Sequence, residues 1–110
     1  MGDDQREQAE LARDLRWAIE RKQLMLYYQP KVDALSLQIT AAEALLRWQH
    51  PTRGIVSPAV FIPIAERHGL IGVIGNWVLD EATRQAALWR DSGLRMRVAI
   101  NVSVYQMRQD

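Results

Sequence analysis

Apolar residues at helical spacing open the chain and predict an amphipathic helix. The other positions of this segment are rich in arginine and glutamate, which is typical of the solvated face of such a helix. Asp4, followed by Glu7, has the spacing of a capping box and predicts where the helix begins. We therefore treat residues 1–23 as a leading amphipathic helix that precedes a unit spanning residues 24–110. The positions that form its apolar face are Leu11, Leu15, Ala18 and Ile19.

Two apolar runs follow the helix. Residues 24–33 (LMLYYQPKVD) predict a strand, and Pro30 near its end favours the edge of a sheet. Residues 34–37 form a short connection. Residues 38–48 (QITAAEALLRW) are ambiguous, because Ala, Glu and Leu are good helix formers, whereas strict alternation would sort a strand into two faces. One face would hold Thr40, Ala42, Ala44, Leu46 and Trp48, and the other Ile39, Ala41, Glu43, Leu45 and Arg47.

A loop and a helix start come next. Residues 50–56 contain Pro51 and Gly54, and they predict a loop. Ser57 followed by Pro58 predicts the start of a helix, because serine caps helices and proline suits the first helical position.

The rest of the chain contains two helices and a strand. The helix after Pro58 should end near Gly69 and be interrupted or kinked by Pro63. Residues 71–91 keep helical spacing, and residues 95–102 alternate as a strand does. The apolar positions of the long helix are Ile74, Trp77, Val78, Ala82, Ala86 and Trp89.

Helices that alternate with strands predict an α/β fold, either layered or closed into a barrel. The tryptophan side chains supply large apolar surfaces that normally pack in a core. We expect burial of Trp17, Trp48, Trp77 and Trp89.

The composition narrows the class of protein. The chain has 110 residues, of which 48% are hydrophobic and 25% are charged, as in a folded globular domain. Its formal net charge of +1 gives no reason to expect a nucleic-acid polymer or an anionic membrane surface as partner. No apolar run approaches the roughly 20 residues of a membrane span. The cysteine count of 0 excludes a disulfide framework, a thiolate metal site and a cysteine nucleophile.

Glu43 stands out because it interrupts an apolar stretch. If the segment is a strand, Glu43 and Arg47 share a face with Leu45 between them. A carboxylate in that position needs a cationic partner or a metal ion. The alternative is a Glu–Arg pair four residues apart on a solvated helix.

Asn101 ends the last predicted strand, where α/β folds place ligand sites. It could equally be a turn or cap residue. Gln29 could bind a ligand or make a cross-strand hydrogen bond. His50 and His68 are isolated in the sequence, so we expect no zinc site.

An ordered set of motifs resembles the EAL domain family. The matching segments extend over about residues 11–106, and the leading helix is similar to the segment that joins a GGDEF domain to an EAL domain. They are Tyr27-Tyr28-Gln29-Pro30-Lys31-Val32-Asp33, Glu43-Ala44-Leu45-Leu46-Arg47-Trp48, His50-Pro51, Phe61-Ile62-Pro63, Ala65-Glu66, Gly69-Leu70-Ile71, Trp77-Val78-Leu79 and Asn101-Val102-Ser103.

The resemblance implies a modified TIM barrel whose first strand runs antiparallel to the others, which favours a strand over residues 38–48. It also implies a cyclic di-GMP phosphodiesterase that forms linear pGpG with two Mg²⁺ or Mn²⁺ ions, which suit oxygen ligands. The positions that match the family's site are Glu43 and Asn101 as catalytic metal ligands, Arg47 as the contact of a substrate phosphate, and Gln29 and Leu45 as lining of the substrate pocket.

The length departs from the family, because a barrel of this type needs about 250 residues. We therefore expect residues 24–110 to be the N-terminal portion of an incomplete barrel that lacks the family's later site residues. We expect this chain alone to be inactive, to retain no Mg²⁺ or Mn²⁺, and to form a homo-oligomer.

Two other functions fit a partial EAL domain: a module that binds cyclic di-GMP without cleaving it, and a protein-interaction module. The presence of Glu43, Arg47 and Asn101 favours descent from an active enzyme. We expect a cytoplasmic location, either alone or as the cytoplasmic part of a larger signalling protein.

Overall fold

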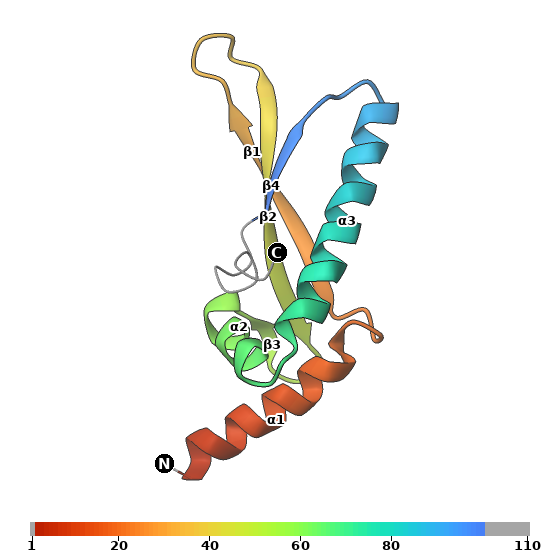
Figure 1. The fold of residues 1–110 in the computed structure, drawn as a ribbon. Helices are drawn as coiled ribbons and strands as arrows, with labels where there is room; N and C mark the ends of the chain where they lie inside the picture. Colours follow the sequence, from red (N-terminus) through yellow and green to blue (C-terminus); the bar gives the residue numbers. More distant parts are fainter. Residues whose placement is uncertain (1, 101–110) are drawn as a thin grey trace.

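The computed structural model describes residues 2–100, which form one mixed sheet with helices at one end and along one face (Figure 1). The shape is elongated, with extents of 54 × 28 × 23 Å. In chain order the elements are α1 (Gly2–Ala18), β1 (Leu24–Val32), β2 (Ile39–His50), β3 (Gly54–Val56), α2 (Pro58–Arg67), α3 (Ile71–Asp91) and β4 (Arg97–Ile100).

Strand β2 is the centre of the sheet. Strand β1 is antiparallel to it, from Leu24 opposite Trp48 to Val32 opposite Ile39, with one register shift between Lys31 and Val32. On the other side of β2, β3 is antiparallel and β4 is parallel. The antiparallel first strand is therefore confirmed, and among residues 2–100 Pro30 lies in an edge strand. Within residues 2–100 the sheet does not close into a barrel.

The ambiguous segment 38–48 is a strand, as the family resemblance favoured. Its burial alternates strictly, with Ala42, Ala44, Leu46 and Trp48 each no more than 4% exposed. A helix would have spread these side chains around its circumference, whereas the strand presents all of them to one core. Tertiary burial thus outweighs the helix propensity of Ala-Glu-Ala-Leu-Leu.

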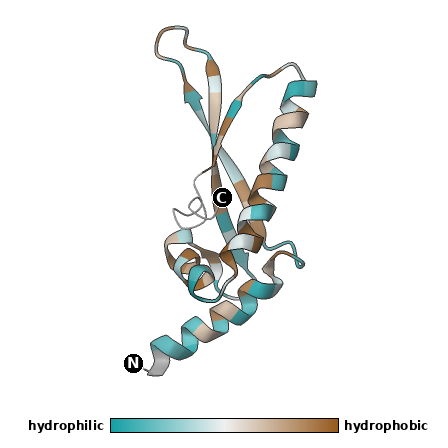
Figure 2. Cartoon of the chain, in the orientation of Figure 1, coloured by the Kyte–Doolittle hydropathy of each residue, from teal (hydrophilic) through white to brown (hydrophobic). Residues whose placement is uncertain are grey.

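The core lies where α1, α2 and the first turns of α3 meet the end of the sheet, and Figure 2 shows hydrophobic residues gathered there. Trp48 is fully buried and meets Phe61 edge-on, with ring centroids 5.7 Å apart. The other buried side chains of this cluster are Leu11, Ala12, Leu15, Ala18, Leu24, Leu46, Val56, Ile62, Ile64, Ala65, Ile71, Ile74 and Val78.

Two predicted boundaries are wrong. The first helix already begins at Gly2, so Asp4 lies inside its first turn, where a carboxylate is favourable to the helix dipole. The predicted loop over residues 50–56 is a tight hairpin, because β2 extends to His50 and Gly54–Val56 adds a short strand. Gly54 has φ 74°, a conformation that glycine adopts without strain.

Smaller differences concern the ends of two strands and the interior of one helix. Strand β1 ends at Val32, because the Asp33 carboxylate accepts hydrogen bonds from the backbone N–H groups of Leu35 and Ser36 and forms the turn. Helix α2 runs through Pro63 without interruption. Strand β4 is described over Arg97–Ile100 only.

The helix predictions are otherwise confirmed. Ser57 caps α2, its Oγ accepting from the N–H of Ala59 at 3.2 Å, and Pro58 follows it. Helix α3 has the predicted bounds.

The prediction that all the tryptophan side chains are buried is wrong in part. Trp48 is in the core, but Trp17 is 47% exposed because it lies off the Leu11–Leu15–Ala18 stripe. The Arg21 guanidinium covers its ring at 5.6 Å. Trp77 and Trp89 are half-buried.

Candidate functional site

The two faces of the sheet have different roles. One face packs on α3, as the edge-on contact between Tyr28 and Trp89 at 5.0 Å shows. The opposite face carries the alternate residues of β1, β2 and β4, and we call it the open face. Its members are Met25, Tyr27, Gln29 and Lys31 on β1, Ala41, Glu43, Leu45 and Arg47 on β2, and Arg97 and Ala99 on β4.

Glu43 lies in the middle of the open face. The register sets it between Gln29 of β1 and Ala99 of β4, and its side chain is 27% exposed. Its Oε2 atom lies 3.2 Å from Nζ of Lys31. The position of Glu43 in a strand excludes the alternative of a solvated helix pair with Arg47.

The contact between Lys31 and Glu43 was not predicted from the sequence. Lys31 is one row away from Glu43, opposite Ala41 on β2. The sequence shows only that Gln29 and Lys31, two residues apart on one strand, share a face. The hairpin register is needed to show that this face also carries Glu43.

Arg47 shares the open face with Glu43, with Leu45 between them, as predicted. Its Nη1 donates to the carbonyl oxygen of Leu46 at 2.9 Å, which is its one hydrogen bond within the described part of the chain. The remaining guanidinium N–H groups form a fork of donors that suits an anionic oxygen.

Gln29 and Leu45 also lie on the open face. Gln29 is exposed directly opposite Glu43, and its side chain makes no hydrogen bond to any described residue, so the cross-strand bond weighed for it is absent there. Leu45 is opposite Tyr27, a residue that is 48% exposed. The face thus combines a carboxylate, a guanidinium, an amide and apolar surface.

Asn101 lies outside the described residues. Ile100, which precedes it in the sequence, is paired with Ala44 of β2.

His50 is not isolated, which corrects the sequence analysis. It is 7% exposed, and its Nε2 lies 2.7 Å from Oδ2 of Asp14 on α1. Its Nδ1 accepts from the backbone N–H groups of Thr52 and Arg53, both at 3.1 Å. Because Nδ1 is an acceptor, the ring proton belongs on Nε2, where it is donated to Asp14. This contact ties α1 to the end of β2.

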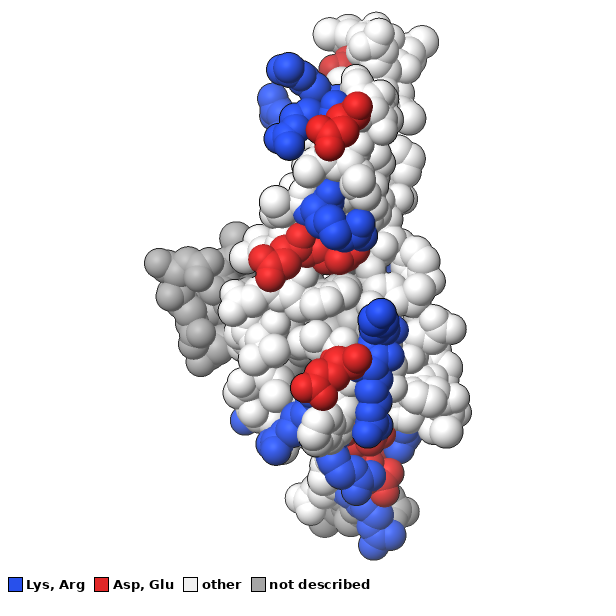
Figure 3. Space-filling view, turned by 90° about the vertical axis from the view of Figure 1, so that its right-hand side faces the viewer, with Lys and Arg blue, Asp and Glu red and all other residues white. Residues whose placement is uncertain are grey.

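Ionisable groups on the α3 side form a separate network. Burial raises the pKa of the Tyr28 phenol, and the nearby Glu81 carboxylate adds to that effect. A hydrogen bond from Arg84 lowers the pKa of Glu81. Figure 3 shows positive and negative side chains interspersed over this side of the molecule.

The described residues offer few metal ligands. No group of three or more His, Cys, Asp or Glu side chains suited to a metal ion occurs within residues 2–100. No helix in the same range is long and apolar enough to cross a membrane.

Comparison with known proteins gives the family. The EAL domain family matches residues 12–110. The bifunctional diguanylate cyclase/cyclic di-GMP phosphodiesterase MucR of Pseudomonas aeruginosa is 50% identical over 107 residues, which are 96% of this chain and 16% of that protein. The cyclic di-GMP phosphodiesterase PdeR of Escherichia coli is 46% identical over 94 residues, 86% of this chain and 14% of that protein.

Solved structures with a similar fold support the same assignment. The phosphodiesterase PaMucR in complex with c-di-GMP superposes with a TM-score of 0.80 at 53% identity, covering 86% of this chain and 38% of that one. The FimX EAL domain of Xanthomonas citri in complex with c-diGMP gives a TM-score of 0.75 at 25% identity, covering 91% and 38%. This sequence therefore spans a minor part of the relatives that it matches. The open sheet with its antiparallel first strand, the motifs and the matched residues together show that the chain belongs to the EAL domain family.

Proposed function

We propose that this chain supplies the first part of a cyclic di-GMP phosphodiesterase site that converts cyclic di-GMP to linear pGpG. The observation that carries the proposal is the half-buried carboxylate of Glu43 at the centre of the open face, with Gln29 beside it and Arg47 farther along β2. Relatives named as cyclic di-GMP phosphodiesterases and a neighbour solved with c-di-GMP support it.

Glu43 fits a hard divalent cation such as Mg²⁺ or Mn²⁺. Its carboxylate oxygens are the donors that such cations prefer, and it is 27% exposed, so a cation can reach it. We propose Asn101 as a second oxygen ligand. When bound, the ions would supply an activated water and offset charge on the phosphodiester. Because residues 2–100 hold no larger ligand cluster, other parts of an EAL domain would have to complete the set.

The remaining residues of the open face would bind the substrate. Arg47 would donate to a phosphate oxygen through the planar fork of its guanidinium. Gln29 would donate or accept at a polar edge of the ligand, and Leu45 would pack against a base. In the reaction, water adds to phosphorus, one bridging P–O bond breaks, and the leaving ribose oxygen takes up a proton. The product is linear pGpG.

The test is hydrolysis by a complete EAL domain that contains this sequence, with Mg²⁺ or Mn²⁺ and cyclic di-GMP, followed by chromatography. Wild type should form pGpG, and Glu43→Ala should lose most of this activity because a ligand is removed. Arg84→Met on α3 is the matched control and should keep it. Unchanged turnover of Glu43→Ala at saturating Mg²⁺ would refute the role of Glu43.

A second candidate is a module that binds cyclic di-GMP without cleaving it. The FimX EAL domain of Xanthomonas citri, solved with c-diGMP, resembles this chain in fold. Tight binding of cyclic di-GMP by the complete domain, with no pGpG formed, would favour this candidate. Either function would place the protein in the cytoplasm, where guanine nucleotides are available, and neither needs a nucleic-acid polymer.

A further inference from the structure

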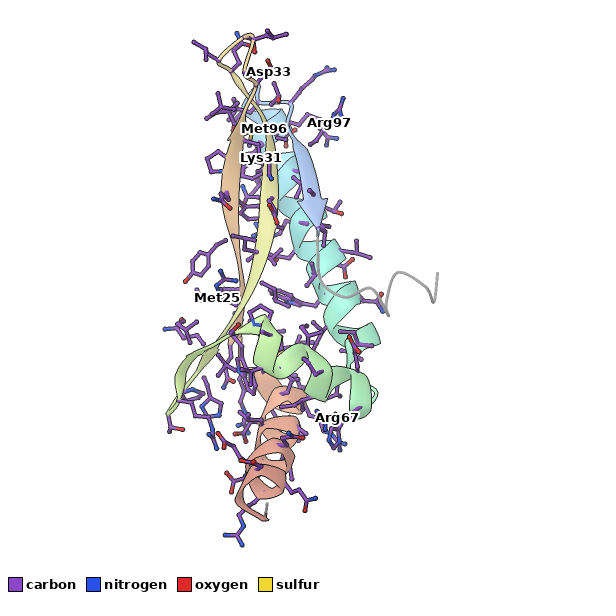
Figure 4. The ribbon with its side chains drawn as sticks, turned by 90° about the vertical axis from the view of Figure 1, so that its left-hand side faces the viewer. Met25, Lys31, Asp33, Arg67, Met96 and Arg97 are labelled. Atoms are coloured by element: carbon purple, nitrogen blue, oxygen red, sulfur yellow. The ribbon has the colours of Figure 1, made fainter. Side chains whose placement is uncertain are left out.

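Lys31 and Glu43 form an ion pair across the β1–β2 hairpin. The Nζ of Lys31 lies 3.2 Å from Oε2 of Glu43, and the two side chains are 58% and 27% exposed. Lys31 starts one row away, opposite Ala41. Lys31 is labelled in Figure 4, and its side chain must cross diagonally from its own row to reach Glu43, which lies opposite Gln29.

The pair supplies Glu43 with a counter-charge. A carboxylate that is largely withdrawn from water needs an opposite charge or hydrogen-bond donors. Of the described cationic side chains, Lys31 makes this contact. Arg47 on the same face donates to the Leu46 carbonyl instead. Arg97 lies on the far side of Ala41, on β4.

We infer that Lys31 is the counter-cation of Glu43 in the metal-free protein and competes with the divalent cation for that carboxylate. The inference rests on the proposed function, in which Glu43 is a metal ligand. An ammonium group 3.2 Å from Oε2 neutralises the carboxylate and repels a dication that approaches it. Lysine suits this role, since its charge sits on a flexible stem that can swing away when the metal binds. Lys31 is thus a positioning residue that sets metal affinity.

The experiment measures Mn²⁺ binding, without substrate, from the electron paramagnetic resonance of free Mn²⁺. It uses a complete EAL domain that contains this sequence. Lys31→Met should bind Mn²⁺ roughly threefold to fivefold more tightly, the range set by a partly exposed ion pair. Lys31→Arg keeps the charge and should bind close to wild type. Arg84→Met, which removes a cation of another ion pair on α3, should leave binding unchanged.

Thermal melting of each variant distinguishes a change in Mn²⁺ affinity from a failure to fold. Metal-free Lys31→Met should melt below wild type, because Glu43 loses its counter-charge, and it should gain more from saturating Mn²⁺ than wild type does. Unchanged or weaker Mn²⁺ binding by folded Lys31→Met would overturn the inference. Glu43→Gln separates the two proposals: if it binds Mn²⁺ as wild type does, the metal-ligand role fails. If it loses Mn²⁺ while Lys31→Met is unchanged, the role of Lys31 alone fails.

Discussion

The imidazole of His50, at the end of β2, is hydrogen-bonded through Nε2 to the Asp14 carboxylate of α1 at 2.7 Å. Arg53, in the turn that follows, contacts Glu7 and Glu10 of the same helix at 3.0 and 3.1 Å. Polar contacts thus reinforce the apolar packing of Leu11 and Leu15. These contacts fix the leading helix to one end of the sheet, and the open face of the same sheet carries the candidate site.

The first prediction concerns Asp14. Asp14→Ala should lower the free energy of unfolding by about 1–2 kcal/mol, because the buried His50 N–H loses its acceptor. Asp14→Asn should cost less, since its amide oxygen can still accept. Urea unfolding of a complete EAL domain containing this sequence measures both, with Glu20→Ala on the exposed face of the leading segment as control. Equal losses in Asp14→Ala and Glu20→Ala would show that the contact contributes nothing.

The second prediction is that the 110-residue chain alone does not hydrolyse cyclic di-GMP. Glu43 is its one described carboxylate on the open face, and a two-metal centre needs several oxygen ligands. Incubation with Mg²⁺ or Mn²⁺ followed by chromatography tests this. Steady formation of pGpG that Glu43→Ala abolishes would contradict it.

The third prediction concerns Arg47 in a complete EAL domain. Arg47→Ala should lower kcat/KM by about 100-fold, as expected for the loss of a charged donor to the reacting phosphate. Arg47→Lys should have a kcat/KM between those of wild type and Arg47→Ala, because lysine keeps the charge but lacks the planar fork. Steady-state kinetics measures both, and circular dichroism checks the fold. A value for Arg47→Ala within about threefold of wild type would mean that the side chain does not stabilise the transition state.

The fourth prediction concerns the acid stability of the hairpin turn. Backbone hydrogen bonds from Ser36 and Leu35 lower the pKa of Asp33 below its ordinary value of 3.8. Because the folded pKa is the lower one, the contribution of Asp33 is present above the ordinary value and is lost as pH falls through the folded pKa.

Asp33→Asn, which keeps an acceptor oxygen but loses the charge, should therefore be less stable than wild type at neutral pH. The difference should vanish once Asp33 is protonated in both states. Unfolding of the two proteins at several pH values between about 6 and 2 measures it. A difference that stays constant over this range would point to a cause other than ionisation.

The sequence predicted most of the helices and strands and the shared face of Glu43 and Arg47, but it did not predict the contacts between distant segments. Alternation placed Glu43 and Arg47 on one face, and this survived into the structure because a buried strand has two fixed sides. Lys31 was missed because its contact depends on the hairpin register, which the turn at Asp33 sets. The partner of His50 was missed because Asp14 is 36 residues away, and no local pattern links the two. Trp17 was misplaced because hydrophobicity alone does not say which side of a helix is covered.

The open sheet gives the last prediction its physical basis. Within residues 2–100, β1 pairs with β2 alone and so does β4, so each leaves an edge without a partner strand. Backbone groups at such edges readily pair with another chain. The open face adds an exposed apolar side chain, Tyr27 at 48%, and the far end of the hairpin adds Ile39 at 51% and Leu35 at 98%. Exposed apolar side chains beside an unpaired strand edge favour association.

We predict that the 110-residue chain is not a stable monomer and forms a dimer or larger species through β1 or the open face. Light scattering after size exclusion, across a dilution series, measures the mass. Tyr27→Lys, which places a charge on the open face beside the β1 edge, should shift the equilibrium toward monomer. The control Val73→Lys changes an exposed apolar residue of α3 and should not. A sharp, concentration-independent monomer with cooperative unfolding would refute the prediction. It would show that the sheet edges are protected without a partner, because an unprotected edge must either pair or leave the chain only marginally folded.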